Sequence, residues 1–371
     1  MFDLPQALRL ASRQRAREAP MAWDFVVAKR DLRHTAFQDV APPPLADGEV
    51  LLAIESFALT ANNITYAAFG EMMKYWDFFP AAEGLGRVPV WGHARVEASA
   101  HPDIAEGQRF YGYWPMSTHL TVQARPGKSG FADVAPHRQP MAAIYNQYLA
   151  VGAEEPLEAY RALLQPLFIT SFLIDDQLDE AGFHGAASVI LSSASSKTAI
   201  ALAALLHRRG GVKVVGLTSP RNKAFVEGLG FYDQVVLYDD IASAPIASPA
   251  VFVDFAGDSQ VLGAVHNRFA DDLKASILVG GTHWEAPRAQ VALPGPQPAF
   301  FFAPDRIAKR RQDWPGGEFD QRYGAAWAPF VADAPRWLKV EEGQGQDAMR
   351  AAYLAQVDGG TAPDVGVVLR P

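Results

Sequence analysis

Hydrophobic positions divide the chain into two regions with different periodicities. In the first region, apolar segments of strand length are separated by polar turns, two of which contain Asp47-Gly48 and Glu106-Gly107. Short strands separated by such turn signals are typical of an all-β barrel. The predicted strands of this region are residues 23–29, 50–60, 88–96, 108–113 and 117–122.

From about Ala142 the pattern predicts helix, and from Ala187 it repeats a module of one short apolar strand and one helix. These strands lack alternation, which indicates that both of their faces are buried, as in a parallel sheet. The repeated module therefore predicts a doubly wound parallel α/β sheet. Its strands are 188–191, 212–218, 234–238, 251–257 and 275–282, its helices are 197–209, 222–229 and 261–269, and a last helix and strand follow at 346–357 and 365–369.

The first junction between strand and helix is the clearest candidate binding site. Between Leu191 and Ile200 the residues are small, many carry hydroxyl groups, and no bulky apolar side chain is present. A tight turn at the carboxyl end of a buried strand and the amino end of a helix is where α/β proteins bind phosphate. The side chains that we expect to contact phosphate oxygens are Ser192, Ser193, Ser195, Ser196, Lys197 and Thr198.

Length and composition indicate a globular protein with two domains. The chain has 371 residues, a length that exceeds what a single hydrophobic core usually supports. Of these residues, 49% are hydrophobic and 20% charged. Its net charge of -8 argues against nucleic acid or an anionic membrane as the main partner. The chain has no cysteine, which excludes disulfides and cysteine-ligated zinc. Because it has neither a recognisable secretory signal nor an apolar run near the ~20 residues of a membrane helix, we expect a cytoplasmic protein.

Several short motifs resemble the zinc-independent, quinone-oxidoreductase-like branch of the medium-chain dehydrogenase/reductase superfamily. Residues 47–56 resemble the opening strand of that branch, and residues 58–66 resemble the loop that carries its active-site Asn and Tyr. Residues 106–112 are similar to its Gly-Asp-Arg-Val turn, and residues 218–222 with 228–230 are similar to the segment after its second nucleotide-binding strand. The likeness covers nearly the whole chain and suggests an uncharacterised bacterial subfamily.

The resemblance implies a Rossmann-like doubly wound parallel sheet domain together with a GroES-like β-barrel domain. We expect an N-terminal arm at 1–21, the first part of the barrel domain at 22–156, the nucleotide-binding domain at 157–300, and a return to the barrel domain at 301–371. The resemblance also implies a homodimer, which we expect to pair through the edge of the nucleotide-binding sheet near Ala275 to Val279.

The nucleotide fingerprint departs from the pattern of this branch, because its three glycine positions fall on Ser193, Ser196 and Ala199. All three are small, so a pyrophosphate could still approach the backbone, but Ser accepts a positive φ less readily than Gly. A degenerate turn that binds nothing remains an alternative. Ser196-Lys197-Thr198 also matches the end of a P-loop, but both required glycines are missing and an NTPase is not favoured.

The end of the second nucleotide-binding strand predicts the cofactor. An acidic residue there would bind the ribose hydroxyls of NAD and repel a 2′-phosphate. This chain instead has Thr218, Ser219, Arg221 and Lys223, and hydroxyl groups with two cations suit a phosphate. The sequence therefore predicts NADP(H), although Arg and Lys are equally common on solvated helix starts. Residues after later strands are further candidates for cofactor binding: Asp254, Gly257, Gly280, Gly281 and Thr282.

Candidate catalytic residues lie on the barrel side of the predicted cleft. The resemblance places the active-site amide and phenol of the branch at Asn62, Asn63 and Tyr66, and Tyr145 with Asn146 adds hydrogen-bonding groups just before the nucleotide-binding domain. The aromatic segment 72–79 could close an apolar pocket, although we favour a core role for it.

No metal is expected, because His93 alone remains of the zinc-binding pattern of the superfamily. We therefore expect an NADPH-dependent, metal-free oxidoreductase that transfers a hydride to an enone, a quinone or a related carbonyl compound, a small apolar electrophile. One alternative is a nucleotide-binding sensor or scaffold protein that has kept the fold without the chemistry. A lyase or other non-redox enzyme on the same frame is another.

Overall fold

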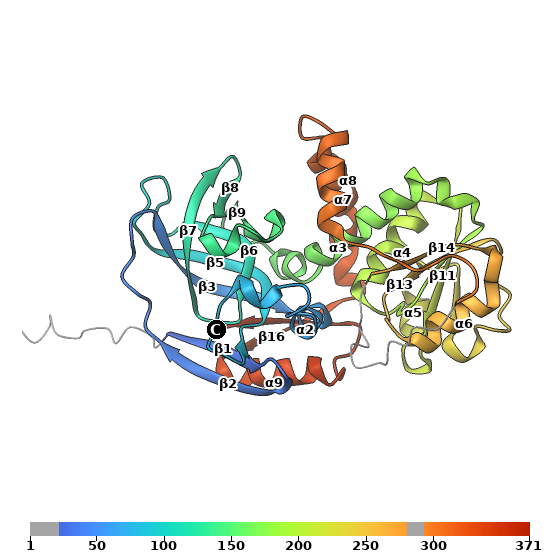
Figure 1. Cartoon of the computed structure of the whole chain (residues 1–371), viewed down its shortest axis with the longest axis horizontal. Helices are drawn as coiled ribbons and strands as arrows, with labels where there is room; N and C mark the ends of the chain where they lie inside the picture. The colour runs from blue at the N-terminus through green and yellow to red at the C-terminus, as the bar shows by residue number, and fades with distance from the viewer. Residues whose placement is uncertain (1–21, 280–292) are drawn as a thin grey trace, which may run out of the picture.

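The computed structural model describes residues 22–279 and 293–371, and it places a β-barrel at one end of the molecule and a parallel sheet at the other (Figure 1). Antiparallel pairing runs through six strands, and the last strand pairs again with the first, which closes the barrel. In order around the barrel the strands are β3 (Glu49–Leu59), β5 (Pro89–Ser99), β6 (Arg109–Pro115), β9 (Gln147–Val151), β8 (Gly130–Asp133) and β7 (His119–Gly127). The barrel predicted from the short strands is confirmed.

The end of the chain returns to this barrel. Strand β17 (Val365–Arg370) pairs antiparallel with β3 and parallel with β16 (Lys339–Gln344), and α9 (Gly345–Val357) joins these two strands. A small separate sheet contains β1 (Ala22–Ala28), β2 (Asp31–Val40) and β4 (Leu85–Gly86).

The second sheet has six strands, and every pairing in it is parallel. The order is β12 (Gln234–Leu237), β11 (Lys213–Thr218), β10 (Ser188–Leu191), β13 (Ala250–Asp254), β14 (Leu273–Leu278) and β15 (Ala299–Phe300). Its crossover helices are α4 (Lys197–Arg209), α5 (Lys223–Leu229) and α6 (Ser259–Phe269). The strands β10 and β13 are buried along their whole length, so the doubly wound, Rossmann-like sheet is confirmed.

The edge of this sheet differs from the prediction. Strand β14 pairs with β13 on one side and, through Ile277 and Leu278, with β15 on the other. The segment Ala275 to Val279 is therefore not the edge of the sheet in the described residues, and the dimer contact near it remains a prediction. The two-residue strand β15, which follows the Pro-rich segment, covers that edge, and its brevity gave no recognisable strand pattern.

Residues 142–157 also differ from the prediction. Helix was expected from about Ala142, but only the 3-10 turn η3 (Ala143–Asn146) forms there, and β9 follows it and completes the barrel. The helix α3 begins only at Glu158 and runs to Glu180. It packs against α4 on the sheet side and against β3 and β5 on the barrel side, so α3 connects the two units. The proposed domain boundaries remain a prediction.

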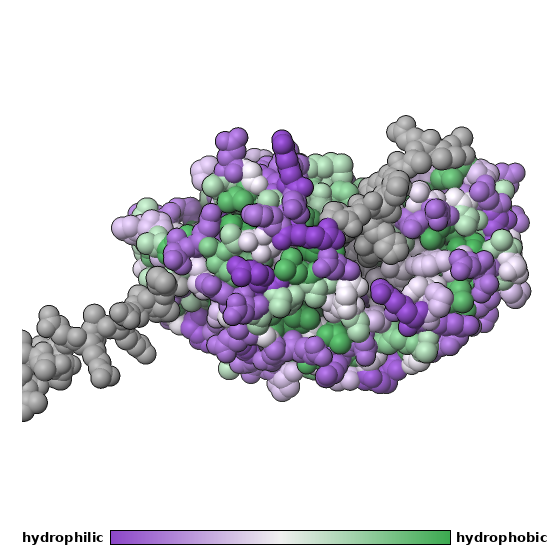
Figure 2. Space-filling view, turned by 90° about the horizontal axis from the view of Figure 1, so that it is seen from below, coloured by the Kyte–Doolittle hydropathy of each residue, from purple (hydrophilic) through white to green (hydrophobic). Residues whose placement is uncertain are grey.

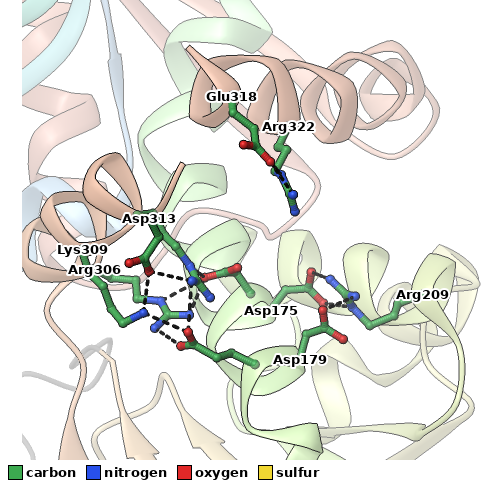
Figure 3. Close-up of polar contacts among 11 residues, drawn as sticks. Asp175, Asp179, Arg209, Arg306, Lys309, Asp313, Glu318 and Arg322 are labelled. Carbon is green, nitrogen blue, oxygen red and sulfur yellow. Dashed lines mark hydrogen bonds and ion pairs between the residues drawn. The ribbon is translucent and has the colours of Figure 1, made fainter. Parts of the chain in front are cut away.

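Two helices that the sequence analysis did not identify, α7 (Ala303–Asp313) and α8 (Glu318–Asp333), pack against α3. Charged side chains anchor α7, as Figure 3 shows. Arg306 and Arg310 both bind the Asp176 carboxylate, at 2.5 and 2.6 Å, and both contact Glu180 at 2.5 and 3.0 Å. Both arginines are buried, so this cluster fixes α7, and with it the start of α8, on α3.

Four predicted features lie outside the described residues: the N-terminal arm, Gly280, Gly281 and Thr282. Within residues 22–279 and 293–371, no helix is long and apolar enough to span a membrane. On the face shown in Figure 2, hydrophobic patches are small and separated by hydrophilic residues, as on most globular proteins.

Candidate functional site

A cleft of about 1890 Å³ lies between the barrel and the parallel sheet and is lined by residues of both. This volume exceeds the 300–1,000 Å³ that is typical of sites for single small molecules. On the sheet side the lining comes from the bend before α4 and from the ends of β11, β13 and β14. On the other side it comes from α2 (Ala61–Ala68), the barrel strands, α3 and α8. The cleft therefore has room for a dinucleotide and a second molecule.

The glycine-poor bend adopts the conformation that glycine normally provides. Ser193 has a φ of +48°, which lies in the left-handed region and costs a residue with a Cβ some strain. Its N–H donates to the Tyr238 phenol oxygen at 3.1 Å. Behind the bend, a Cβ on Gly216 would lie 2.9 Å from the Ala194 Cβ. The glycine that this turn needs is thus in the neighbouring strand β11, where it allows the bend to pack closely.

The amino end of α4 opens into the cleft. Ser196 is its N-cap, and its Oγ accepts from the Ala199 N–H at 3.3 Å. The N–H groups of Lys197 and Thr198 occupy the first two helical positions, where an α-helix supplies no acceptor. Ser195 also lines the cleft, and its Oγ accepts from the Asn222 side chain at 3.0 Å. Free amides, hydroxyls and the positive end of the helix dipole together suit an anionic oxygen.

Lys197 lines the cleft but directs its charge elsewhere. Its Nζ donates to the Val365 carbonyl oxygen at 2.8 Å and to that of Pro363 at 3.4 Å. Burial lowers the pKa of this amine to about 8, and the Asp364 carboxylate opposes the shift. Lys197 therefore joins the bend to the C-terminal segment, which differs from the phosphate contact expected from sequence.

Asp254, at the end of β13, lines the cleft and binds neighbouring groups through hydrogen bonds. Its Oδ1 accepts from the Ser192 hydroxyl at 2.6 Å and from the Gly257 N–H at 3.2 Å. Burial raises the pKa of Asp254, and the hydrogen bonds from Ser192, Gly257 and Ala256 partly oppose this. Both Asp254 and Gly257 line the cleft, and their hydrogen bonds tie the bend to the next strand.

The residues predicted to distinguish the two nicotinamide cofactors divide into two groups. Thr218, Ser219 and Arg221 line the cleft at the end of β11. Within the described part of the chain, the Arg221 guanidinium has no hydrogen-bond or ion-pair partner. Lys223 does not line the cleft and forms an i,i+4 ion pair with Glu227 at 3.8 Å.

On the barrel side, Asn62, Tyr66 and Tyr145 line the cleft with Trp91. The Tyr66 phenol oxygen accepts from Trp91 Nε1 at 3.4 Å. Burial and the neighbouring Tyr75 raise the pKa of Tyr66, while hydrogen bonds with Trp91, Asn62 and Tyr145 oppose the shift. Tyr66 is therefore a neutral hydroxyl at ordinary pH, held in place by a polar and aromatic surrounding.

Two predicted catalytic residues lie elsewhere. Asn63 caps α2: its Oδ1 accepts from the Thr60 N–H at 2.7 Å, and its Nδ2 donates to the Pro89 carbonyl at 2.9 Å. Asn146 binds Arg138, accepting from Nε at 2.9 Å and donating to its carbonyl oxygen at 2.8 Å. Both amides are buried, and neither lines the cleft.

The aromatic segment 72–79 serves both of its predicted purposes. Trp76, Phe78 and Phe79 are buried in the core, whereas Met72 and Tyr75 line the cleft. Sequence reasoning missed several further aromatic residues of the lining, because nothing in the sequence distinguishes them from core residues; among them are Trp91, Tyr111, Tyr238 and Tyr323.

His93 is buried and does not line the cleft. Burial lowers its pKa to about 4, although the nearby Glu158 opposes the shift, so the imidazole is neutral at pH 7. Its Nδ1 lies 3.4 Å from Glu158 Oε1, and that carboxylate is bound by Arg109 at 2.6 Å. Among the residues whose positions are described, no group of three or more His, Asp or Glu side chains could hold a metal ion.

Solved structures share this fold over nearly the whole chain. CurA from Vibrio vulnificus, in complex with NADPH, superposes with a TM-score of 0.62 at 15% identity, covering 94% of this chain and 99% of that one. The yhdH oxidoreductase from Salmonella enterica in complex with NADP gives 0.51 at 14% identity, covering 94% and 99%. A mutant enoyl thioester reductase from Candida tropicalis gives 0.55 at 10% identity, covering 95% and 100%. The fold implied by the resemblance to medium-chain reductases is therefore confirmed.

Comparison with curated protein sequences finds no match. A family model described as "Protein of unknown function (DUF2855)" matches residues 57–362. This match includes the bend before α4, residues from both sides of the cleft, and the aromatic segment 72–79. The chain therefore belongs to the DUF2855 family.

Proposed function

We propose that this protein is an NADPH-dependent reductase that reduces a small apolar electrophile, an enone or a quinone, without a metal ion. The observation that carries the proposal is that one cleft joins the phosphate-type bend before α4 to the Asn62 and Tyr66 side chains of the barrel. A hydride donor bound along the sheet would thus lie beside hydrogen-bond donors for an oxygen atom. The NADPH and NADP complexes of CurA and of the yhdH oxidoreductase, which share the fold, support this choice of cofactor.

The sheet side of the cleft would hold the cofactor. Ser195, Ser196 and Thr198 offer hydroxyl groups, and the first amides of α4 offer N–H donors, to the pyrophosphate. Arg221 would bind the 2′-phosphate, because a guanidinium recognises phosphate oxygens bidentately. The single hydroxyl of NAD at this position would leave Arg221 without that partner.

The barrel side would stabilise the reacting oxygen. NADPH, when bound, supplies the hydride. Reduction of an enone or a quinone places negative charge on the carbonyl oxygen, which requires hydrogen-bond donors already directed at it. Asn62 and Tyr66 provide an amide and a phenol at the cleft. Because Tyr66 remains protonated at ordinary pH, it can donate a hydrogen bond to that oxygen.

The mouth of the cleft favours an apolar substrate. Of the four large hydrophobic side chains that are exposed in the described part of the chain, Met72, Leu149 and Phe300 line the cleft. Exposed apolar groups that line a cleft mark a ligand or partner surface. They would cover the apolar part of a substrate whose carbonyl group lies deeper.

A nucleotide-binding sensor is the second candidate, and two observations favour it. The Ser193 N–H donates to Tyr238, and the Lys197 amine donates to backbone carbonyls. A bend whose donors already have partners inside the protein binds phosphate less strongly than a glycine-rich loop. A protein that only senses the nucleotide could tolerate this weaker binding.

Separate titrations with NADPH and NADH test the proposal. We expect NADPH to raise the melting temperature more than NADH at equal concentration, and NADPH to be oxidised when enones and quinones are added. A thermal shift without oxidation of any compound in the panel would support the sensor. If neither nucleotide shifts the melting temperature, both readings are wrong.

A further inference from the structure

Tyr111, in strand β6, has a buried hydroxyl group that nothing in the described structure binds. The residue is 4% exposed, and its phenol oxygen has no hydrogen-bond partner. The ring stacks on Trp91 at 5.8 Å and lies 5.3 Å from the His93 ring. A buried hydroxyl without a partner has lost its hydrogen bonds to water, so its presence in a cleft needs an explanation.

Tyr323, in α8, is a second residue of the cleft lining with the same property. Its phenol oxygen is also buried without a partner in the described residues, and its ring packs between Phe168 and Phe172 of α3, at 5.7 and 5.6 Å. Both tyrosines line the cleft. Two unpaired hydroxyls thus belong to residues that come from separate elements and line one cavity.

The electrostatic surroundings of the pair favour an electron-rich ligand atom. The two phenols are near enough that charge on Tyr323 raises the pKa of Tyr111, after burial as the main cause. Arg161 acts in the opposite direction on both tyrosines and supplies a positive field. The His93 ring, which contacts the Tyr111 ring, lies beside the Glu158 carboxylate. Arg109 neutralises this carboxylate with hydrogen bonds of 2.6 and 3.1 Å. Because burial raises the pKa of both phenols, both hydroxyls remain protonated donors.

We infer that Tyr111 and Tyr323 form a second polar subsite that binds a carbonyl oxygen of the substrate other than the one that reacts. The inference rests on the proposed function, in which Asn62 and Tyr66 bind the reacting oxygen. The substrate class is then a dicarbonyl compound, with two carbonyl oxygens at opposite ends of an apolar frame.

The test measures binding without cofactor, so that it does not depend on turnover. Isothermal titration compares 1,4-naphthoquinone, which has two opposed carbonyl oxygens, with 1-tetralone, which has one on a similar frame. The absence of cysteine removes the thiols that quinones modify most readily. The variants are Tyr111→Phe and Tyr323→Phe, and the matched control is Tyr353→Phe. Tyr353 also has a buried phenol oxygen that no described residue binds, but it packs against Phe25 and does not line the cleft.

We expect each cleft variant to weaken binding of the quinone about 3- to 10-fold and to leave binding of the tetralone within about twofold. The control variant should change neither. Equal effects on both compounds, or no effect on the quinone, would overturn the inference.

Melting temperatures of the free proteins provide a second measurement. Loss of an unpaired buried hydroxyl should leave stability unchanged or raise it, so a lower melting temperature for Tyr111→Phe would reveal a structural partner and also overturn the inference. Failure of NADPH to reduce either compound contradicts the proposed function alone, because the binding comparison remains valid.

Discussion

The two walls of the cleft are built in opposite ways. The sheet wall presents small hydroxyl side chains and backbone groups, many of them from the bend Ser193 to Thr198 that the sequence shows directly. The barrel wall presents aromatic side chains from α2, β5, β6, η3 and α8, which are far apart in the chain. Recognition of a phosphate needs local backbone geometry, whereas recognition of an apolar electrophile needs a surface that only packing assembles. Mutations in the sheet wall should therefore change cofactor binding, and mutations in the barrel wall should change turnover of the substrate.

The first prediction concerns the ion pairs that hold α7 on α3, next to the α8 helix of the barrel wall. Asp176→Ala removes the carboxylate shared by two buried arginines of α7, Arg306 and Arg310, and should reduce the free energy of unfolding by about 3 kcal/mol. Urea denaturation measures this loss. Glu318→Ala, which breaks the exposed Glu318–Arg322 pair shown in Figure 3, should cost less than about 0.5 kcal/mol. A loss of the same size in both variants would show that the anchor of α7 is not special.

The next effect tests the chemistry of the barrel wall. Tyr66→Phe removes the proposed donor to the reacting oxygen and should lower kcat for NADPH oxidation about 100-fold. The dissociation constant of NADPH should stay the same, because Tyr66 belongs to the other wall. Tyr75→Phe is the control, since within residues 22–279 and 293–371 the Tyr75 hydroxyl has one hydrogen-bond partner, the Tyr145 hydroxyl at 3.4 Å. An equal fall in kcat for both variants would remove Tyr66 from the mechanism.

A smaller effect tests the sheet wall. Arg221→Ala should weaken NADPH binding about 10-fold and NADH binding less than twofold, because only NADPH carries the 2′-phosphate. Fluorescence titration of each nucleotide measures this. Lys223→Ala should change neither affinity, since Lys223 lies off the cleft and pairs with Glu227. Equal losses for both nucleotides would mean that Arg221 does not recognise the 2′-phosphate.

The smallest effect concerns the Lys197 link between the sheet side and the C-terminal segment. Its folded-state pKa of about 8 is below the ordinary 10.5, so the unfolded chain binds more protons between these values. Stability therefore rises with pH across this window. From pH 7.5 to 9.5, the wild type should gain about 1 kcal/mol relative to Lys197→Met. Parallel urea curves measure the difference, and a difference that is constant with pH would contradict the lowered pKa.

Local signals predicted much of the fold. Strand β10, helix α4, and the crossover units that follow agree with the structure within a few residues, because runs of buried aliphatic residues ended by glycine have one reading. The segment before Glu158 was misread as helix, because the apolar residues of β9 fit either periodicity and only pairing with β6 and β8 decides between them. Helices α7 and α8 escaped prediction because their buried faces are formed largely by arginines and aromatics paired with α3.

The sequence by itself determined the two kinds of sheet, the bend with its small hydroxyl residues, and the absence of cysteine chemistry, since these depend on local periodicity and residue type. Only the tertiary structure decided which side chains face the cleft. It directed the Lys197 amine to backbone carbonyls and the Asn63 and Asn146 amides to structural hydrogen bonds. It also placed Tyr111 and Tyr323 in the same cleft, although they are distant in the chain. The physical reason is that a polar side chain takes whichever partner packing brings within about 3 Å, and that partner is usually remote in sequence.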